Sequence, residues 1–229
     1  MMKKILRTSW LALVLLFMYL PVLTLMVYSF TDTATIGTTG NFSLQNYKTL
    51  FTTGELLHMI GGTFALALGS ALLATVLGTL GAIGAFYSRK GAKHFIQMMN
   101  QVPVVNAEVV TGFSLCVLLI VVFGMSKESF FPLIVGHVVL EAPFVYLSVL
   151  PKLKQMDNSI YEAARDLGAN AREALFKVVI PQLIPGIVSG FMLSVTLSLD
   201  DYFITTYTKP ATFDTISTYV VNATKGSHT

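Results

Sequence analysis

The sequence SIYEAARDLGANAREALFKVVIPQLIP, residues 159–185, begins with a polar stretch that separates two long apolar segments. Ser159 and Glu162 have the spacing of a capping box, in which paired side chains accept backbone N–H groups that the first helical turn leaves unpaired. This spacing predicts a short helix that begins at Ile160. A polar helix between two apolar segments is expected to lie outside the membrane.

A second short helix is predicted directly after the first. Gly168 can take the left-handed backbone conformation that ends a helix at little steric cost. Asn170 followed by Glu173 repeats the pattern of a cap and an acidic residue. In the first helix, Ala163 and Ala164 leave a low-relief surface that another protein can approach closely. The stretch therefore predicts two short helices joined by a bend.

These residues resemble the cytoplasmic signature of ABC importer permeases, which reads E-A-A, three residues, G, nine residues, then I-x-L-P. Here the series is Glu162-Ala163-Ala164, Gly168 and the run VVIP at 178–181, and only this last part departs from the signature. The resemblance implies a coupling helix that docks into a groove of an ATPase subunit. The residues that it assigns to coupling are Glu162, Ala163, Ala164, Asp166 and Gly168. An ordinary helical hairpin on the surface is the alternative.

The composition is that of an integral membrane protein. Hydrophobic residues make up 54% of the chain and charged residues 12%, and the mean hydropathy is +0.69. Soluble domains average about 25% charged residues. The chain has no G-x-x-x-x-G-K-[ST] loop and no cluster of metal ligands, so we expect neither an enzyme nor a bound cofactor. ATP and Mg²⁺ would be bound by a separate ATPase, and no nucleic-acid partner is expected.

The apolar runs predict an all-α protein with about five transmembrane helices in one domain, residues 1–229. The expected spans are residues 10–30, 59–87, 104–123, 130–150 and 178–204, with a coupling loop at 151–177. The first span is too long for a signal peptide and is expected to stay uncleaved. Residues 31–58 are expected to form a polar loop with a short amphipathic piece near residues 44–51.

The second span carries small residues at every fourth position. These are Ser70, Ala74, Gly78 and Ala82. Such a ridge lets another helix pack closely against the backbone, so this span is expected inside the bundle.

The basic residues predict the orientation in the bilayer. Eleven of the 15 Lys and Arg residues fall on the side of the N-terminus and the coupling loop, and four fall on the other side. The positive-inside rule therefore places the N-terminus and the coupling loop in the cytoplasm. Five spans leave the C-terminus outside, whereas permeases of this size end with a sixth span. We hypothesise that the chain is a fragment cut before that last helix.

Four carboxylates fall within the predicted spans, namely Glu108, Glu141, Asp200 and Asp201. Ionisable residues in a span normally face the bundle interior or a water-filled cavity. With a rise of about 1.5 Å per residue, Asp200 is expected near the outer mouth, Glu141 near mid-span and Glu108 in the inner third. This ladder of negative charge favours a cation, and Tyr146 and Tyr202 offer aromatic faces to an ammonium group.

Each carboxylate also has a purely structural interpretation. Glu141 lies four residues after His137, so the two side chains could hydrogen-bond within the protein. Glu108 could be protonated, or could pair with Asn106 or with a partner subunit. One of the two adjacent aspartates could simply be solvated at the outer boundary.

Several segments resemble the spermidine/putrescine importer permeases over nearly the whole chain. These segments are YLPVLTLMVYSF (19–30), PVVNAEVVTG (103–112), EAPFVYLSVLPKL (141–153) and SLDDYFITTY (198–207). The resemblance implies an acidic residue at Glu108 and an Asp pair at Asp200 and Asp201, whereas Glu141 does not match. It also implies four partners: a homologous permease subunit, a cytoplasmic ABC ATPase dimer, an extracytoplasmic polyamine-binding protein and a polyamine substrate.

Two other functions stay open on the sequence alone. The first is an ABC importer permease for another small solute, such as iron or a phosphonate. The second is a proton-coupled cation carrier that uses the buried carboxylates as relays and needs no ATPase.

Overall fold

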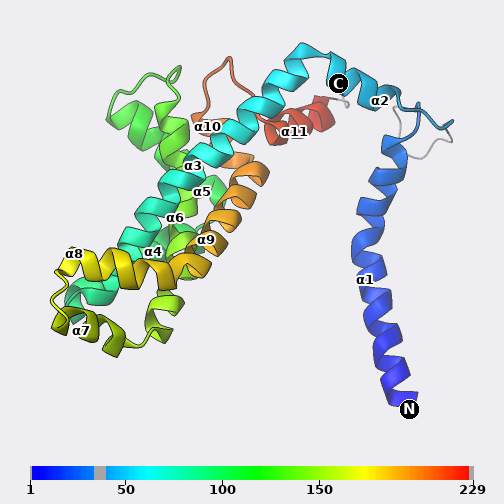
Figure 1. Cartoon of the computed structure of the whole chain (residues 1–229). Coiled ribbons are helices and arrows are strands. Elements are labelled where there is room, and N and C mark those ends of the chain that lie inside the picture. The colour runs from blue at the N-terminus through cyan, green and yellow to red at the C-terminus, as the bar shows by residue number, and fades with distance from the viewer. Residues whose placement is uncertain (1, 34–39, 227–229) are drawn as a thin grey trace. The chain divides into compact units, whose positions relative to one another are not determined.

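The computed structural model describes residues 2–33 and 40–226, and within these residues the structure is almost entirely helical (Figure 1). The one pairing of extended backbone among them is an isolated bridge between Thr31 and Phe42. The prediction of an all-α protein is confirmed. The chain divides into two compact units, Met1–His58 and Met59–Thr229. Residues 34–39, inside the predicted polar loop, lie outside the described residues.

The first unit contains α1 (Met2–Ser29) and α2 (Gln45–Thr52). The segment Arg7–Ser29 of α1 is long and apolar enough to cross a bilayer. The start of α2 is tied to the end of α1, because Asn46 Nδ2 donates to the carbonyl oxygens of Ser29 and Thr31. The short helix that the sequence predicts near residues 44–51 is therefore present.

The remaining helices follow in chain order. They are α3 (Gly54–Tyr87), α4 (Lys90–Val105), α5 (Glu108–Cys116), α6 (Phe131–Gln155), α7 (Asn158–Asp166), α8 (Ala171–Ala174), α9 (Ile180–Asp200), α10 (Phe203–Thr208) and α11 (Ile216–Gly226). Two π-helical stretches extend this set: Val117–Val122 continues α5, and Leu175–Val179 joins α8 to α9.

Four of the described helices are long and apolar enough to cross a membrane, and α4 with α5 makes a fifth if the bent pair counts as one span. Pro103 lies inside α4, which continues to Val105. Asn106 and Ala107 then adopt extended backbone, and the helix axis turns by 106°. Proline removes one N–H donor, and α4 tolerates this loss within two residues of its end.

The last long helix differs from its prediction at both ends. The second short helix of the 159–185 stretch is not separate, because Ala171–Asp200 forms one continuous helical run of 30 residues through the π-helical turn. The run ends at Asp200 rather than at residue 204, since Asp201 has extended backbone.

The centre of the second unit is formed by α6 and α9, which run side by side (Figure 1). Gly190 makes this contact close, because a Cβ at that position would lie 3.0 Å from Val145 Cα. The predicted ridge of α3 is also confirmed, since Ser70, Ala74, Gly78 and Ala82 are all buried.

Gly78 allows α3 to pack directly on the backbone of α6. A Cβ at this position would lie 2.6 Å from the carbonyl oxygen of Ala142 and 2.7 Å from Val145 Cβ. We expect Gly78→Ala to destabilise the protein by about 1–3 kcal/mol, because neither neighbour is the flexible end of a side chain. Thermal unfolding of the detergent-solubilised protein measures the effect.

Gly84→Ala is the matched control on the same helix, since nothing lies within 4 Å of a Cβ at Gly84. Alanine is favoured over glycine inside a helix by about 0.5–1 kcal/mol, so the control should be slightly stabilised. If Gly78→Ala and Gly84→Ala had the same melting temperature, close packing at Gly78 would be contradicted.

Candidate functional site

The helix α7 has a different cap from the predicted one. The side chain of Asp157, not that of Ser159, caps the helix, and its Oδ1 accepts the Ser159 N–H at 2.9 Å. The helix therefore begins two residues earlier than predicted. This hydrogen bond lowers the pKa of Asp157, since it favours the ionised form. The cap is therefore retained at neutral pH and lost only as the pH falls through this lowered value.

The bend after α7 has the predicted chemistry. Gly168 has a positive φ of 90°, which confirms the left-handed conformation. The capping box of Asn170 and Glu173 is also confirmed, with both reciprocal hydrogen bonds present. The Asn170 N–H and then the charge of Lys177 lower the pKa of Glu173, so this cap too is retained at neutral pH.

The helix α7 presents an apolar face to its surroundings. Helical spacing brings Ile160, Ala163, Ala164 and Leu167 to one side, and we call these four residues the α7 face. Leu167 is 89% exposed and Ile160 is 45% exposed, although both are large and apolar. The sequence argument missed these two residues, but their spacing around the alanine pair could have revealed them. Glu162 and Asp166 are exposed on the opposite side of the helix by the same spacing.

The helix α7 is anchored to the rest of the second unit by an aromatic contact. Tyr161 packs against the buried cluster formed by α3, α6 and α9, and its ring centroid lies 5.9 Å from that of Tyr87 at the end of α3. The turn that follows is closed by Arg165, whose Nη1 donates to the Ala169 carbonyl oxygen at 2.9 Å. A force applied to the α7 face would therefore be transmitted directly to a membrane-spanning helix.

Two of the carboxylates predicted for the substrate path are exposed at the ends of helices. Asp200 is the last residue of α9, and Glu108 is the first residue of α5. The helix α5 packs on α10, which follows Asp200 closely in the chain. The helices are held in this arrangement by close packing of α5 on α10, where a Cβ at Gly112 would lie 3.1 Å from Ile204 Cα. The packing of α5 on α10 brings the helix ends that carry Glu108 and Asp200 into the same part of the second unit, and we call these two carboxylates the acidic group.

Tyr202 lies beside this acidic group and already contacts an ammonium group. The Nζ of Lys225 lies 5.0 Å from the centroid of the Tyr202 ring and donates to the hydroxyl at 3.1 Å. An aromatic face that accepts one ammonium can accept another of the same size. The position of Tyr202 is therefore compatible with the predicted role in binding a cation.

The other two predicted path carboxylates, Glu141 and Asp201, are buried. Asp201 caps α10, because its Oδ1 accepts the Ile204 N–H and its Oδ2 accepts the Thr205 N–H. Glu141 Oε1 lies 3.6 Å from His137 Nδ1, which is close enough for an ion pair but not for the expected hydrogen bond, and it accepts a hydrogen bond from Ser70 instead. The polar side chains of α9 divide in the same way: Ser189, Thr196 and Asp200 are exposed, whereas Ser194 and Ser198 are buried with Asp201. A direct role of Glu141 and Asp201 in transport stays a prediction.

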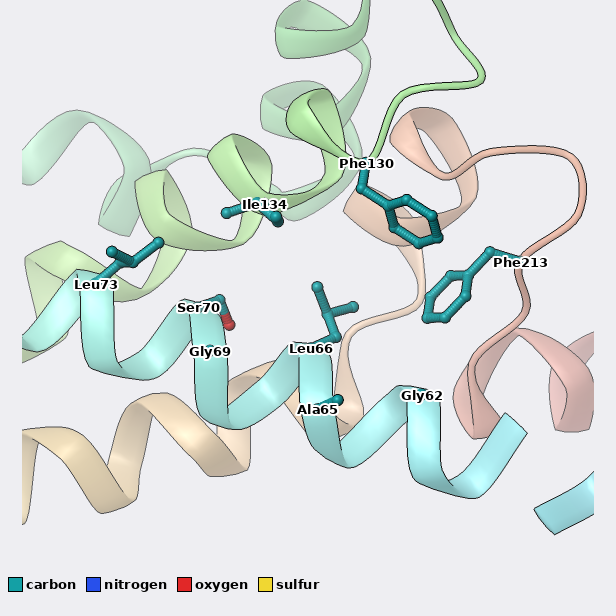
Figure 2. Close-up of a pocket in the computed structure, with 9 residues that line it drawn as sticks. All are labelled: Gly62, Ala65, Leu66, Gly69, Ser70, Leu73, Phe130, Ile134 and Phe213. Atoms are coloured by element: carbon teal, nitrogen blue, oxygen red, sulfur yellow. The ribbon is translucent and has the colours of Figure 1, made fainter. Parts of the chain in front are cut away.

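A pocket of about 320 Å³ lies between α3, the start of α6 and the loop before α11 (Figure 2). Its walls are almost wholly apolar, and the rings of Phe130 and Phe213 meet edge to face with centroids 5.2 Å apart. Ser70 is the one residue with a side-chain hydroxyl in the lining. A polyvalent cation would lose its hydration there without an exposed carboxylate in return, so the acidic group is the better candidate for a cation.

Comparison with known proteins agrees with this architecture. A family described as binding-protein-dependent transport system inner membrane component matches residues 75–226. The chain belongs to this family. It is therefore a transport subunit rather than an enzyme, and it is a multi-pass membrane protein.

Individual relatives are similar over most of the chain. The spermidine/putrescine transport system permease protein PotC of Escherichia coli strain K12 is 28% identical over 98% of this chain and 84% of its own length. The putrescine transport system permease protein PotI of the same strain is 30% identical over 89% of this chain and 75% of its own length. A crystal structure of an amino acid ABC transporter with histidines shares the fold, with a TM-score of 0.50, 20% identity, and coverage of 82% of this chain and 91% of that one.

Proposed function

We propose that this chain is the membrane-spanning permease subunit of an ATP-driven importer that carries polyamines such as spermidine and putrescine into the cytoplasm. The observation that carries the substrate class is the acidic group formed by Glu108 and Asp200, two exposed carboxylates at the ends of different helices, with Tyr202 two residues after Asp200. The names of the similar permeases support the same substrate class.

The chemistry of a polyamine fits this group. Each protonated amine can donate charge-assisted hydrogen bonds to a carboxylate and can lie over an aromatic face. The exposed face of α9, with Ser189 and Thr196 below Asp200, continues the polar surface along the helix. A neutral solute would gain little from the carboxylates, and an anion would be repelled.

The proposed assembly has four other polypeptides. A homologous permease subunit lies beside this chain, two copies of a cytoplasmic ATPase bind ATP and Mg²⁺, and an extracytoplasmic binding protein delivers the polyamine. The helix α7 docks into a groove of the ATPase on the cytoplasmic side, with the α7 face against one wall, Glu162 and Asp166 against the other, and the turn at Gly168 at its end. Closure of the ATPase dimer moves α7, and the contact of Tyr161 with Tyr87 transmits this movement to α3.

Uptake by the complete transporter, reconstituted in proteoliposomes, tests the proposal. We expect labelled spermidine to accumulate only when ATP and the binding protein are both present, and we expect excess unlabelled putrescine to compete. A neutral amino acid or thiosulfate should not compete. If a neutral or anionic solute is taken up instead, the chain is a permease for another solute.

A second arrangement of the same experiment separates an ATP-driven importer from a proton-coupled carrier. Vesicles that lack the ATPase subunit but hold a proton gradient should not accumulate spermidine. Uptake that persists under these conditions would contradict the proposal and favour the carrier.

A further inference from the structure

The strongest feature outside the acidic group is a chain of polar side chains sealed inside the second unit. It contains three ionisable residues, His137 and Glu141 of α6 and Asp201 after α9, which have 0%, 0% and 3% of their surface exposed. Three hydroxyl residues, Ser70 of α3, Ser198 of α9 and Thr205 of α10, connect them. The chain joins four helical elements, and nothing in the proposed transport mechanism uses it.

The hydrogen bonds at the Asp201 end show whether Nε2 of the His137 ring carries a hydrogen. Thr205 Oγ1 donates to Asp201 Oδ2 at 2.8 Å, so its only hydrogen is already used. The same oxygen lies 3.1 Å from His137 Nε2. Thr205 can therefore only accept in this contact, and Nε2 must carry the hydrogen.

The hydrogen bonds at the Glu141 end bear on whether the other ring nitrogen, Nδ1, carries a hydrogen. Ser70 Oγ donates to Glu141 Oε1 at 2.8 Å, which uses its only hydrogen. Ser198 Oγ lies 3.3 Å from Ser70 Oγ and 2.9 Å from His137 Nδ1. If Ser198 donated to Nδ1, no hydrogen would lie between the two serine oxygens. With Glu141 ionised, both contacts are satisfied only when Nδ1 carries a hydrogen and Ser198 donates to Ser70.

The charges favour the same assignment. His137 Nδ1 lies 3.6 Å from Glu141 Oε1, and Nε2 lies 3.7 Å from Asp201 Oδ2. Among the described residues, no Lys or Arg forms an ion pair with either carboxylate, and Lys209, directly after α10, is bound to Asp214. Lys225 is bound to the hydroxyl of Tyr202, next to Asp201, and forms no ion pair with Asp201 among the described contacts. Asp200, the other neighbour of Asp201 in the chain, is also acidic. Two buried carboxylates without a cation would be strongly unfavourable.

We propose that His137 is a buried proton-holding site: it is an imidazolium ion that bridges Glu141 and Asp201 and acts as a positioning residue for the junction between α9 and α10. From His137 the donors run outward in both directions, through Thr205 to Asp201 and through Ser198 and Ser70 to Glu141. The site fixes the Asp201 carboxylate that caps α10, and it therefore fixes the backbone between Asp200 and Tyr202. This inference does not depend on which solute is carried.

Nitrogen NMR of the full chain labelled with ¹⁵N-histidine tests the protonation state directly. The complete transporter in lipid nanodiscs is measured near neutral pH, and His137 is assigned by the signal that disappears in His137→Gln. We expect both ring nitrogens of His137 to show the imidazolium signature. The signature of a neutral tautomer, with one bare nitrogen, would overturn the proposal.

A second measurement keeps the test valid if His137→Gln does not fold. Glutamine leaves two buried carboxylates without a cation, so we expect a lowered melting temperature or no folded protein. Adding Glu141→Gln removes one of these charges, so the double variant should recover most of the loss and can serve for the NMR assignment. His94→Gln, at an exposed position, is the matched control and should change neither the melting temperature nor the His137 signal. If the double variant is as unstable as the sum of the single variants, the charge pairing is absent and the proposal fails.

Discussion

Ala163→Arg is expected to abolish solute uptake while the protein still folds and inserts. Ala163 is exposed at the centre of the α7 face, and its small side chain lets a partner approach the helix closely. An arginine there adds a long charged side chain to an interface that otherwise presents Ile160, Ala164 and Leu167. The loss of a central contact in an interface costs about 2 kcal/mol or more, which is roughly 30-fold in affinity.

Two measurements separate a docking defect from a folding defect. The amount of ATPase that co-purifies with the permease subunits should fall in proportion to uptake. The melting temperature of the permease should be unchanged. Ala171→Arg is the matched control, because Ala171 is also exposed but begins the next helix, away from the α7 face. Full uptake with a normal amount of bound ATPase in Ala163→Arg would remove α7 from the interface.

The spans and the loop between them were largely predictable because they depend on local sequence. Hydropathy over about 20 residues marks a membrane helix, and the ridge at Ser70, Ala74, Gly78 and Ala82 follows from helical spacing alone. Gly168 and the capping box of Asn170 also depend only on neighbours in the chain. These features were correct for that reason.

The bend between α4 and α5 was not predictable in the same way. Pro103 is the obvious local signal, but the chain turns at Asn106 and Ala107, where neither residue type requires extended backbone. The turn accompanies the close packing of Gly112 against Ile204, which lies far away in the sequence. Only the tertiary arrangement shows that Glu108 comes near Asp200.

The separation of Asp200 from Asp201 has a similar origin. The two residues are adjacent and chemically identical, yet one is exposed and the other is 3% exposed. The difference arises because α9 ends between them and the Asp201 carboxylate caps α10. His137, which meets this carboxylate from α6, gave a pairing signal only toward Glu141, four residues away. The sequence therefore predicted that His137 lies near Glu141, but not that it also meets Asp201.

Asp200→Asn, combined with Glu108→Gln, is expected to reduce spermidine uptake about tenfold to a hundredfold. Hydrogen bonds to charged groups contribute about 1.5–3 kcal/mol, and the amide side chains keep the shape but lose the negative charge that an ammonium group requires. The maximal rate of ATP hydrolysis should be retained, because neither residue lies near the α7 face. Each single variant should show a smaller loss, since one carboxylate is left to bind the cation.

Glu128→Gln is the control for a general effect of negative charge, since Glu128 is exposed in the loop before α6 and outside the acidic group. It should transport normally. The acidic group and the buried residues around His137 should respond differently to the solute. Raising the spermidine concentration should partly restore uptake in Asp200→Asn. It should not restore the melting temperature of His137→Gln. If uptake by the double variant of Asp200 and Glu108 equals that of the unaltered protein, the cation crosses elsewhere.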